Sequence, residues 1–187
     1  MMSICVIYGS TRKGNSEILA EIALKNIQCT RVYLRDKHIE PIADTKEIKD
    51  GCQIVSDDFN EVISTMLNHE TILFVTPLYW YGMSGIMKNF IDRWYQIVWE
   101  KHYQFKEKMS QKKVYVIIVG GGAKMTGLLL VQQFKYIFDY LSITFSGYIL
   151  GNAKDANEIL LDQSAVFSAK LLNQELLDAY QSINQSN

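Results

Sequence analysis

The fold is decided by residues 3–16, which read SICVIYGSTRKGNS. Residues 3–8 are rich in apolar side chains, and a continuous run of this length is typical of a strand covered on both faces of a parallel sheet. Gly9 and a polar loop follow, and apolar residues at helical spacing begin at Ile18. The order of strand, glycine-containing loop and helix predicts a βα unit at the start of the chain.

The same alternation continues along the chain. Further β-rich runs predict strands at residues 30–34, 71–76, 114–119 and 144–150. Apolar side chains at helical spacing separate them, at Ile18/Ile22, Phe59/Ile63/Leu67, Phe90/Trp94/Val98 and Leu130/Phe134/Phe138, and a last helix carries Phe167, Leu171, Leu172, Leu176 and Tyr180. Five strands alternating with five helices predict right-handed crossovers and an open, doubly wound α/β sheet. Residues 35–56 predict a long connection, and residues 181–187 a fraying polar tail.

Composition narrows the class of protein. The 187 residues suit one domain, spanning residues 1–187, and 48% hydrophobic with 21% charged residues excludes wholesale disorder. Nineteen Lys and Arg against twenty Asp and Glu give a net charge of -1, which argues against a nucleic-acid binder. No stretch approaches the roughly 20 apolar residues that span a bilayer, so no membrane partner is expected. Three cysteines without a secretory leader predict a reduced, cytoplasmic protein.

The loop after the first strand, residues 9–16, has the features of an anion site. It offers hydroxyls, two cations, a permissive glycine and the N-terminus of a helix, whose N–H groups and dipole favour an anion. A nucleoside-triphosphate loop is excluded because Asn15 stands where a Lys is needed, and a dinucleotide fingerprint because Thr11 replaces the second Gly. A phosphate monoester fits better. The alternative is an ordinary helix capped by Asn15 or Ser16.

The loop after the third strand, residues 76–85, reads TPLYWYGMSG and carries three successive aromatic residues. A strand–helix junction lacks the depth to bury all three, and an exposed aromatic patch is avoided by soluble monomers unless something covers it. A flat ring system would cover it, and Gly82 and Gly85 would let the backbone approach such a ring. The alternative is a subunit interface, where Tyr and Trp are also favoured.

The loop after the fourth strand, residues 120–127, begins with three glycines. They permit close approach to a ligand, with a plain turn as the alternative. The helices predicted at residues 86–99 and 125–141 are apolar over more than one stripe, which is typical of helices that are either deeply buried or packed against another subunit. Two exposed-looking Trp residues favour the second alternative. We therefore predict a homodimer, or a dimer of dimers, through side chains spread around these helices: Trp94, Tyr95, Trp99, Leu128, Leu129, Leu130 and Tyr136.

Residues 9–16 and 77–93 together resemble the NADPH-dependent FMN reductase family, and within it the iron–sulfur-flavoprotein branch of NAD(P)H oxidoreductases. The resemblance implies a flavodoxin-like three-layer sandwich with a five-stranded parallel sheet in the order 2-1-3-4-5, bound FMN, and NAD(P)H as reductant. It implies contacts with the FMN phosphate in the first loop, from Ser10, Thr11, Arg12, Gly14, Asn15 and Ser16. It implies contacts with the ring and ribityl chain from Pro77, Leu78, Tyr79, Trp80, Tyr81, Gly82 and Met83, and from Gly121 and Gly122.

Two features of the resemblance stay open. Lys88, Asp92 and Arg93 match family positions, but a charge cluster on one helix face explains them equally well. Cluster-bearing relatives carry a compact cysteine motif after the second strand, whereas residues 35–56 here hold only Cys52. An iron–sulfur cluster is therefore not expected, and no metal site is predicted.

The function that follows from the resemblance is an FMN-dependent NAD(P)H oxidoreductase. A hydride would pass from the nicotinamide to FMN and then to a quinone, a nitro or azo compound, free flavin or a similar acceptor. Because the flavin carries the chemistry, no catalytic side chain is required, and the three histidines are scattered. The alternatives are a flavodoxin-type electron carrier, which the near-neutral charge disfavours, and a flavin-free binding module.

Overall fold

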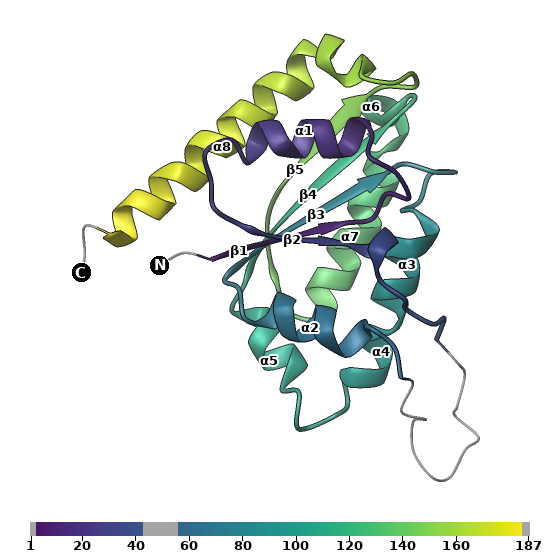
Figure 1. Ribbon diagram of the computed structural model, residues 1–187, viewed down its shortest axis with the longest axis vertical. Helices are drawn as coiled ribbons and strands as arrows, with labels where there is room; N and C mark the ends of the chain where they lie inside the picture. Colours follow the sequence, from purple (N-terminus) through teal and green to yellow (C-terminus); the bar gives the residue numbers. More distant parts are fainter. Residues whose placement is uncertain (1–2, 43–55, 185–187) are drawn as a thin grey trace.

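The computed structural model of the chain describes residues 3–42 and 56–184. Strands and helices alternate along it (Figure 1). The strands are β1 (Ile4–Tyr8), β2 (Thr30–Tyr33), β3 (Thr71–Pro77), β4 (Lys113–Gly120) and β5 (Thr144–Asn152). The helices are α1 (Asn15–Ala23), η1 (Leu34–Asp36), α2 (Phe59–Leu67), α3 (Gly85–Asp92), α4 (Trp94–Ile97), α5 (Phe105–Ser110), α6 (Ala123–Thr126), α7 (Leu128–Tyr140), η2 (Glu158–Leu161) and α8 (Gln163–Asn184).

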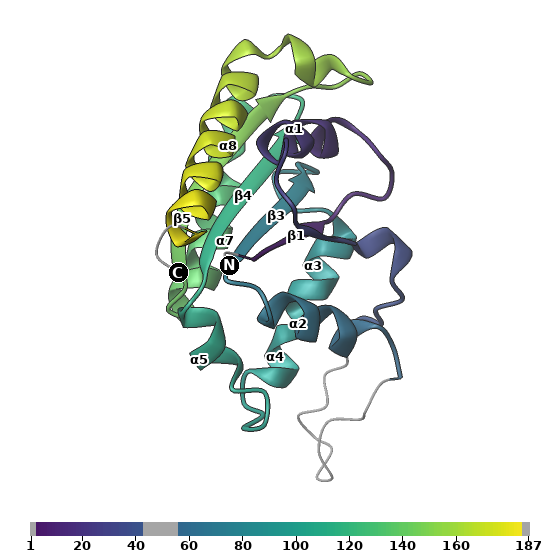
Figure 2. The same ribbon diagram turned by 60° about the vertical axis from the view of Figure 1, so that its left-hand side comes forward.

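All five strands are parallel and lie in the order β2-β1-β3-β4-β5. Helices α1 and α8 cover one face of the sheet, and α2, α3, α4 and α7 cover the other (Figures 1 and 2). Each predicted strand is present, with its ends within two residues of the prediction. The flavodoxin-like three-layer fold and the strand order expected from the sequence are confirmed.

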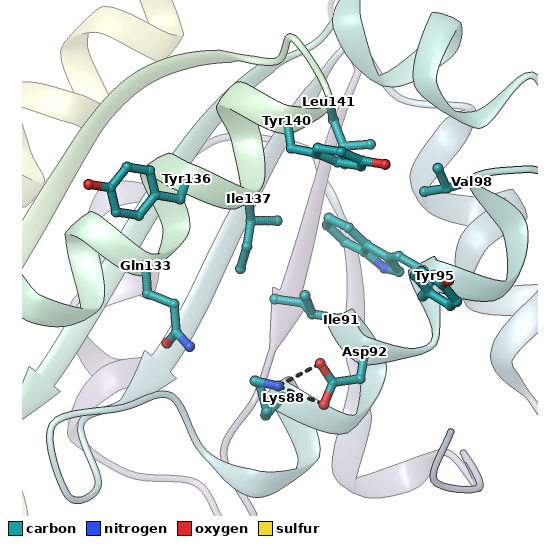
Figure 3. A pocket seen from close by; sticks show the side chains of 11 residues that line it. Lys88, Ile91, Asp92, Tyr95, Val98, Gln133, Tyr136, Ile137, Tyr140 and Leu141 are labelled. Atoms are coloured by element: carbon teal, nitrogen blue, oxygen red, sulfur yellow. Dashed lines mark hydrogen bonds and ion pairs between the residues drawn. The ribbon is translucent and has the colours of Figure 1, made fainter. Parts of the chain in front are cut away.

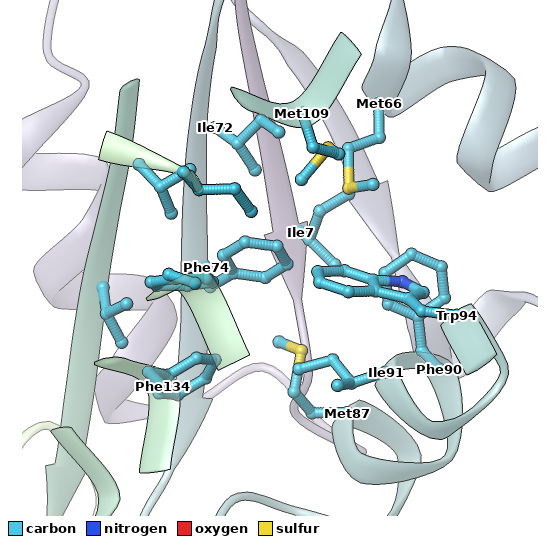
Figure 4. Close-up of a cluster of buried hydrophobic side chains, with 14 of the residues drawn as sticks. Ile7, Met66, Ile72, Phe74, Met87, Phe90, Ile91, Trp94, Met109 and Phe134 are labelled. Carbon is cyan, nitrogen blue, oxygen red and sulfur yellow. The ribbon is translucent and has the colours of Figure 1, made fainter. Parts of the chain in front are cut away.

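The core has two layers because successive side chains of a strand point to opposite faces of the sheet. In β3, Ile72 and Phe74 face the larger layer, whereas Leu73 and Val75 face α1 and α8. The larger layer is aromatic at its centre: the Phe74 ring lies 5.9 Å from the Trp94 ring, with Phe90 beside them (Figure 4). This double burial explains why the central strands read as unbroken apolar runs.

Two of the predicted helices are wrong in detail. The helix expected over residues 86–99 is interrupted at Arg93, and the one expected over 125–141 is divided at Gly127. Trp94 and Leu130, expected at an interface, are 3% and 0% exposed and belong to the core. Trp99, Leu128, Leu129 and Tyr136 are exposed as expected, and so is Tyr95.

The C-terminal helix also differs from the expectation. It continues to Asn184, so residues 181–184 are helical rather than part of a frayed tail. Its buried stripe is formed by Ala165, Ala169, Leu172 and Leu176, whereas Phe167 and Leu171 are exposed. The small alanines let α8 approach α1 closely. Apolar periodicity alone does not tell a buried stripe that contains alanines from one formed by the larger apolar residues. The side chain of Tyr180 lies outside the described residues. None of the described helices combines the length and apolar character needed to cross a bilayer.

Candidate functional site

A cavity of about 180 Å³ lies at the carboxyl ends of β1, β3 and β4, where three loops meet. This is the edge at which open α/β sheets bind ligands. Nine predicted residues line it: Ser10, Arg12, Gly14, Asn15, Ser16, Pro77, Leu78, Tyr79 and Gly121. The lining also includes residues that the sequence analysis missed: Val119, Gly120, Ala153 and Lys154. The missed residues stand at the ends of β4 and β5, so the carboxyl-edge rule could have found them.

The remaining predicted residues lie outside the lining, which is formed without Thr11, Trp80, Tyr81, Gly82, Met83 and Gly122. Met83 is 7% exposed and packs into the larger core layer. Thr11 is exposed beside the first loop. Trp80 and Tyr81 project from the second loop, where they are 95% and 56% exposed. The sequence predicted that the loop could not bury all of its aromatic residues, and these two are indeed exposed.

The first turn of α1 opens the cavity to an anion. The helix begins at Asn15, and its N-cap residue, Gly14, has an extended backbone and provides no side-chain cap. The predicted alternative, a helix capped by Asn15 or Ser16, is therefore wrong. An uncapped first turn leaves backbone N–H donors without a side-chain acceptor at the positive end of the helix dipole. Such a turn can bind a phosphate.

The charged side chains of the cavity lining are both cations, Arg12 and Lys154. Within residues 3–42 and 56–184, neither one forms an ion pair with a carboxylate. The nearby Glu17 carboxylate is buried behind Ser10 and is paired with Arg35. The lining therefore carries positive charge and no carboxylate, which fits the phosphate group of FMN.

Ser10 is held from behind the cavity. Its hydroxyl donates a 2.7 Å hydrogen bond to Oε1 of Glu17, a residue of the first turn of α1. The Arg35 guanidinium donates to the same oxygen and lies 4.4 Å from the centre of the Tyr33 ring. Because Ser10 and Glu17 are both buried, these contacts fix the backbone of the first loop against the start of α1.

Asn15 has a role that the sequence did not indicate. Its Nδ2 donates to the carbonyl oxygen of Asp155 at 2.8 Å, and its Oδ1 accepts from the backbone N–H of Ile159 at 3.4 Å. Both bonds cross from α1 to the segment after β5. The Asn15 side chain thus ties the first turn of α1 to the loop that carries Lys154.

The second loop forms a tight hairpin turn. Tyr79 and Gly82 exchange two backbone hydrogen bonds of 3.0 Å, and the central residues Trp80 and Tyr81 have φ values of 48° and 65°. Positive φ at both centres is the requirement of a type I′ turn, which Asn and Gly normally meet. Bulky residues rarely adopt it, and each costs about 1–3 kcal/mol. The turn thus holds two exposed aromatic side chains at the rim of the site under backbone strain.

The glycines of the third loop give neighbouring chains room. A Cβ on Gly120 would stand 2.9 Å from Cβ of Leu78, and one on Gly121 would stand 2.7 Å from Cγ of Lys154. Gly122 has a φ of +78°, and its N–H donates to Oδ1 of Asn152 at 2.6 Å. The loop is therefore packed against the second loop on one side and against the end of β5 on the other.

Asp162 supports that end of β5. Its carboxylate accepts from Nζ of Lys124 at 2.5 Å, from the N–H of Asn152 at 2.8 Å and from the N–H of Ala165 in α8 at 3.1 Å. Burial opposes its charge, but these hydrogen bonds outweigh burial and lower the pKa of Asp162 to about 2. Asp162 thus stays ionised and links the third loop to α8.

Lys88, Asp92 and Arg93 lie away from the cavity. Nζ of Lys88 donates to both carboxylate oxygens of Asp92, at 2.5 and 2.7 Å, which is the helix-face pair that the sequence left as an alternative (Figure 3). Arg93 is buried, and its guanidinium bonds Oδ2 of Asp57 at 2.5 Å and the carbonyl oxygen of Glu40 at 2.9 Å. The cavity lining of the candidate site includes none of these three residues.

Lys88 and Asp92 instead border a second depression, a groove of about 660 Å³ between α3–α4 and α7. Figure 3 shows Ile91 and Tyr95 on one side and Tyr136, Ile137 and Tyr140 on the other. The groove is mainly apolar and opens to the surface, and Tyr95, Tyr136 and Tyr140 are each more than half exposed. It belongs to the helices for which the sequence predicts a subunit interface.

The histidines and cysteines of the described chain lie outside the cavity. His69 bonds the carbonyl oxygen of Thr65 and the hydroxyl of Thr30, at 2.6 and 2.7 Å, and so fastens α2 to β2. His38 and His102 are exposed. Burial raises the pKa of Cys5 to about 12, which makes that thiol unreactive. Cys52, the one cysteine of the long connection, lies outside the described residues.

Comparisons with known proteins agree with the geometry. Residues 2–154 match the family described as NADPH-dependent FMN reductase. The chain is 41% identical over 174 residues to a Bacillus subtilis (strain 168) protein that carries the provisional name NAD(P)H-dependent FMN-containing oxidoreductase YwqN, covering 91% of this chain and 96% of that protein.

Two further relatives extend the comparison. The solved structure of a Trp repressor binding protein from Bacillus subtilis has a TM-score of 0.76 and 37% identity, covering 91% of this chain and 96% of that one. The iron–sulfur flavoprotein of Archaeoglobus fulgidus (strain ATCC 49558 / DSM 4304 / JCM 9628 / NBRC 100126 / VC-16) is 24% identical over 135 residues, which cover 70% of this chain and 67% of that protein. The branch that the loops resemble is thus among the relatives.

Proposed function

The chain belongs to the NADPH-dependent FMN reductase family, and we propose that it transfers a hydride from NAD(P)H, through FMN bound at the three-loop cavity, to a small planar acceptor. The acceptors that we propose are quinones, nitro and azo compounds, free flavins and similar molecules. One observation carries the proposal: a cavity whose charged lining is entirely cationic lies beside an exposed aromatic turn at the carboxyl edge of the sheet. A phosphate and a flat ring system are the two ends of FMN.

At the phosphate end, the chain supplies donors and positive charge. The uncapped first turn of α1 offers backbone N–H groups, and Arg12 offers a guanidinium that can meet a phosphate with two parallel hydrogen bonds. The ion pair between Glu17 and Arg35 keeps the buried carboxylate behind the loop from repelling an anion. The first loop thus binds and orients the phosphate without a catalytic role.

At the ring end, the chain supplies an aromatic and apolar surface. Pro77, Leu78 and Tyr79 line the cavity next to the third loop, and the strained turn holds the Trp80 and Tyr81 side chains at its rim. Aromatic contacts of this kind contribute about 0.5–1.5 kcal/mol each beyond the area they bury. When bound, FMN supplies the redox chemistry, accepting a hydride and passing the electrons on. The remaining aromatic surface can hold the nicotinamide or the acceptor by stacking.

The proposal is tested first by the absorption spectrum of the purified protein and then by rapid mixing with NADPH and NADH without oxygen. We expect bound FMN whose visible absorption bleaches with at least one nicotinamide and returns on addition of a quinone. Arg12→Met should weaken FMN binding about tenfold or more, whereas Lys25→Met, at an exposed lysine just beyond the far end of α1, should not. Bound FMN that neither nicotinamide reduces would favour the electron carrier. A colourless protein that ignores added FMN would refute the site.

For the assembly, we propose the homodimer that the sequence predicts, with the groove between α3–α4 and α7 covered by a second copy. The mainly apolar lining and the exposed Tyr95, Tyr136 and Tyr140 support it, since Tyr is favoured at interfaces. Light scattering should give about twice 21.5 kDa, and Tyr136→Glu should shift the mass toward one chain. A monomeric wild type would refute this assembly. The cytoplasmic location stays a prediction.

A further inference from the structure

Lys154 lines the cavity together with residues of the first loop, and the function proposed above uses its charge but assigns it no contact with the ligand. It comes two residues after the end of β5, far in sequence from Arg12. In Figures 1 and 2 the segment after β5 lies at the same end of the sheet as the start of α1. The aliphatic stem of Lys154 packs directly on Gly121. A Cβ added to Gly121 would stand 2.7 Å from Cγ and 2.9 Å from Cε of Lys154.

The loop that carries Lys154 is held in place by four hydrogen bonds. The N–H groups of Lys154 and Asp155 both donate to Oε2 of Glu158, at 2.5 and 2.9 Å. Asn15 bonds the carbonyl oxygen of Asp155 and the N–H of Ile159 from the first turn of α1. These bonds therefore fix the position of Lys154 relative to the first turn of α1, which is the turn that would bind the phosphate.

Within residues 3–42 and 56–184, the Lys154 ammonium group forms no ion pair. The backbone N–H groups of Lys154 and Asp155 and, at longer range, the Lys154 charge lower the pKa of the Glu158 carboxylate. A lysine beside a cavity with no acidic lining residue raises the affinity for an anion, and a phosphate monoester is the anion proposed above for the first loop. We propose that Lys154 is a second cation for the FMN phosphate, placed by Gly121 below its stem and by Asn15 through its loop. This inference rests on the proposed function and adds a phosphate contact from the end of β5.

The test compares FMN with riboflavin, which lacks the phosphate. Full-length protein freed of flavin is titrated with each flavin, and binding is followed by quenching of flavin fluorescence. In Lys154→Met, which keeps an apolar stem and removes the charge, the Kd for FMN should rise about tenfold or more while the Kd for riboflavin changes less than about twofold. Lys154→Arg should retain most of the FMN affinity. Lys25→Met, an exposed residue just beyond the far end of α1, is the control for net charge.

A second variant addresses the placement of Lys154. Gly121→Ala should displace the lysine stem and lower the preference for FMN over riboflavin, and this loss should disappear in the Lys154→Met background. Equal weakening of both flavins in Lys154→Met would overturn the inference, since it would indicate a structural role. An unchanged FMN affinity with a raised KM for NADPH would also overturn it, by assigning Lys154 to the dinucleotide. Wild-type protein that binds no FMN would instead refute the proposed function.

Discussion

The Ser84 hydroxyl, at the N-cap of α3, donates a hydrogen bond to the backbone carbonyl oxygen of Gly9, just after β1. Ser84 also accepts the N–H of Met87 at 3.3 Å, and its own N–H donates to the hydroxyl of Thr76 at 3.2 Å. One buried side chain therefore joins the loop proposed for the phosphate to the loop proposed for the ring. This contact holds the two loops of the proposed cofactor site together.

Ser84→Ala should therefore affect both stability and binding. It removes the α3 cap and leaves a buried carbonyl oxygen without this donor, and we expect a loss of about 1–3 kcal/mol in the free energy of unfolding. FMN affinity should fall as well, because the first loop loses its tie to α3. Urea denaturation and flavin titration measure the two effects. Ser64→Ala, on the exposed face of α2, should stay within about 0.5 kcal/mol of wild type. A Ser84 variant as stable as wild type would contradict this prediction.

Substitution of Gly9 and of Gly85 by Ala should have opposite effects on stability. A Cβ on Gly9 would stand 2.7 Å from Cε and 2.8 Å from Cβ of Met87, whereas one on Gly85 meets nothing within 4 Å. Gly9→Ala should lower stability by about 1–3 kcal/mol through overpacking. Gly85→Ala should be neutral or stabilising by up to about 1 kcal/mol, because Ala favours the first turn of α3. Thermal unfolding of the two variants decides the matter. If Gly9→Ala melts no lower than Gly85→Ala, the packing account is wrong.

The ion pair between Arg93 and Asp57 is buried, with side chains 5% and 0% exposed. Burial opposes the charge of Asp57, but hydrogen bonds from Arg93 and the N–H groups of Glu40 and Phe59 lower its pKa. Arg93→Met leaves that carboxylate buried without its partner, which should cost about 3–5 kcal/mol of stability. Lys88→Met breaks the half-exposed pair on the same helix and should cost at most about 1 kcal/mol. Similar losses in the two variants would contradict the view that the buried pair contributes more to stability than the half-exposed one.

The arrangement of Asp162 predicts a loss of stability in acid. Its pKa is about 2 in the folded protein against an ordinary value of 3.8, so its carboxylate stabilises the fold fully above pH 3.8. That contribution, about 2 kcal/mol, is lost as the pH falls from 3.8 toward 2. Asp162→Asn keeps an oxygen to cap α8 but removes the charge. Its stability deficit in urea should therefore be large at pH 6 and shrink toward pH 2.5. Asp139→Asn, in an exposed pair with Lys135, should show a small deficit at both values.

Residue pattern predicted the five strands and the carboxyl edge because central parallel strands must be apolar on both faces. The two helix interruptions were not predicted, and both positions make contacts with residues distant in sequence. Arg93, at the end of α3, bonds Asp57, and a Cβ on Gly127, between α6 and α7, would stand 2.9 Å from Cδ2 of Leu150 as well as 2.4 Å from the carbonyl oxygen of Ala123.

The same limit applies to the candidate site. The first loop carries recognisable residue types at recognisable spacing, so Arg12, Gly14 and Ser16 could be named from the sequence. Lys154 follows a strand end with no motif around it, and only the fold brings it beside the first loop. Asn15 was assigned to the phosphate, but its side chain bonds the loop that carries Lys154. Residue type alone does not tell which neighbour an amide will meet.

The strained turn at Trp80 and Tyr81 gives a prediction in which stability and function move in opposite directions. Asn and Gly are the preferred central residues of a type I′ turn, so the double change Trp80→Asn with Tyr81→Gly should relieve strain and raise the free energy of unfolding by about 1–3 kcal/mol. The same change removes two exposed aromatic side chains at the rim of the proposed site. FMN affinity, or the rate of flavin reduction by NAD(P)H, should therefore fall about tenfold.

The control for the double change is Trp99→Asn, which removes an aromatic side chain that is 69% exposed and lies outside the turn. We expect it to alter neither the flavin titration nor the rate of reduction. If the turn variant is more stable and binds and reduces FMN as the wild type does, the strain has no part in this site, and the exposed aromatics belong to another surface of the protein. If the turn variant is less stable than the wild type, the aromatic side chains stabilise the fold by packing, and the claim that the turn is strained is wrong.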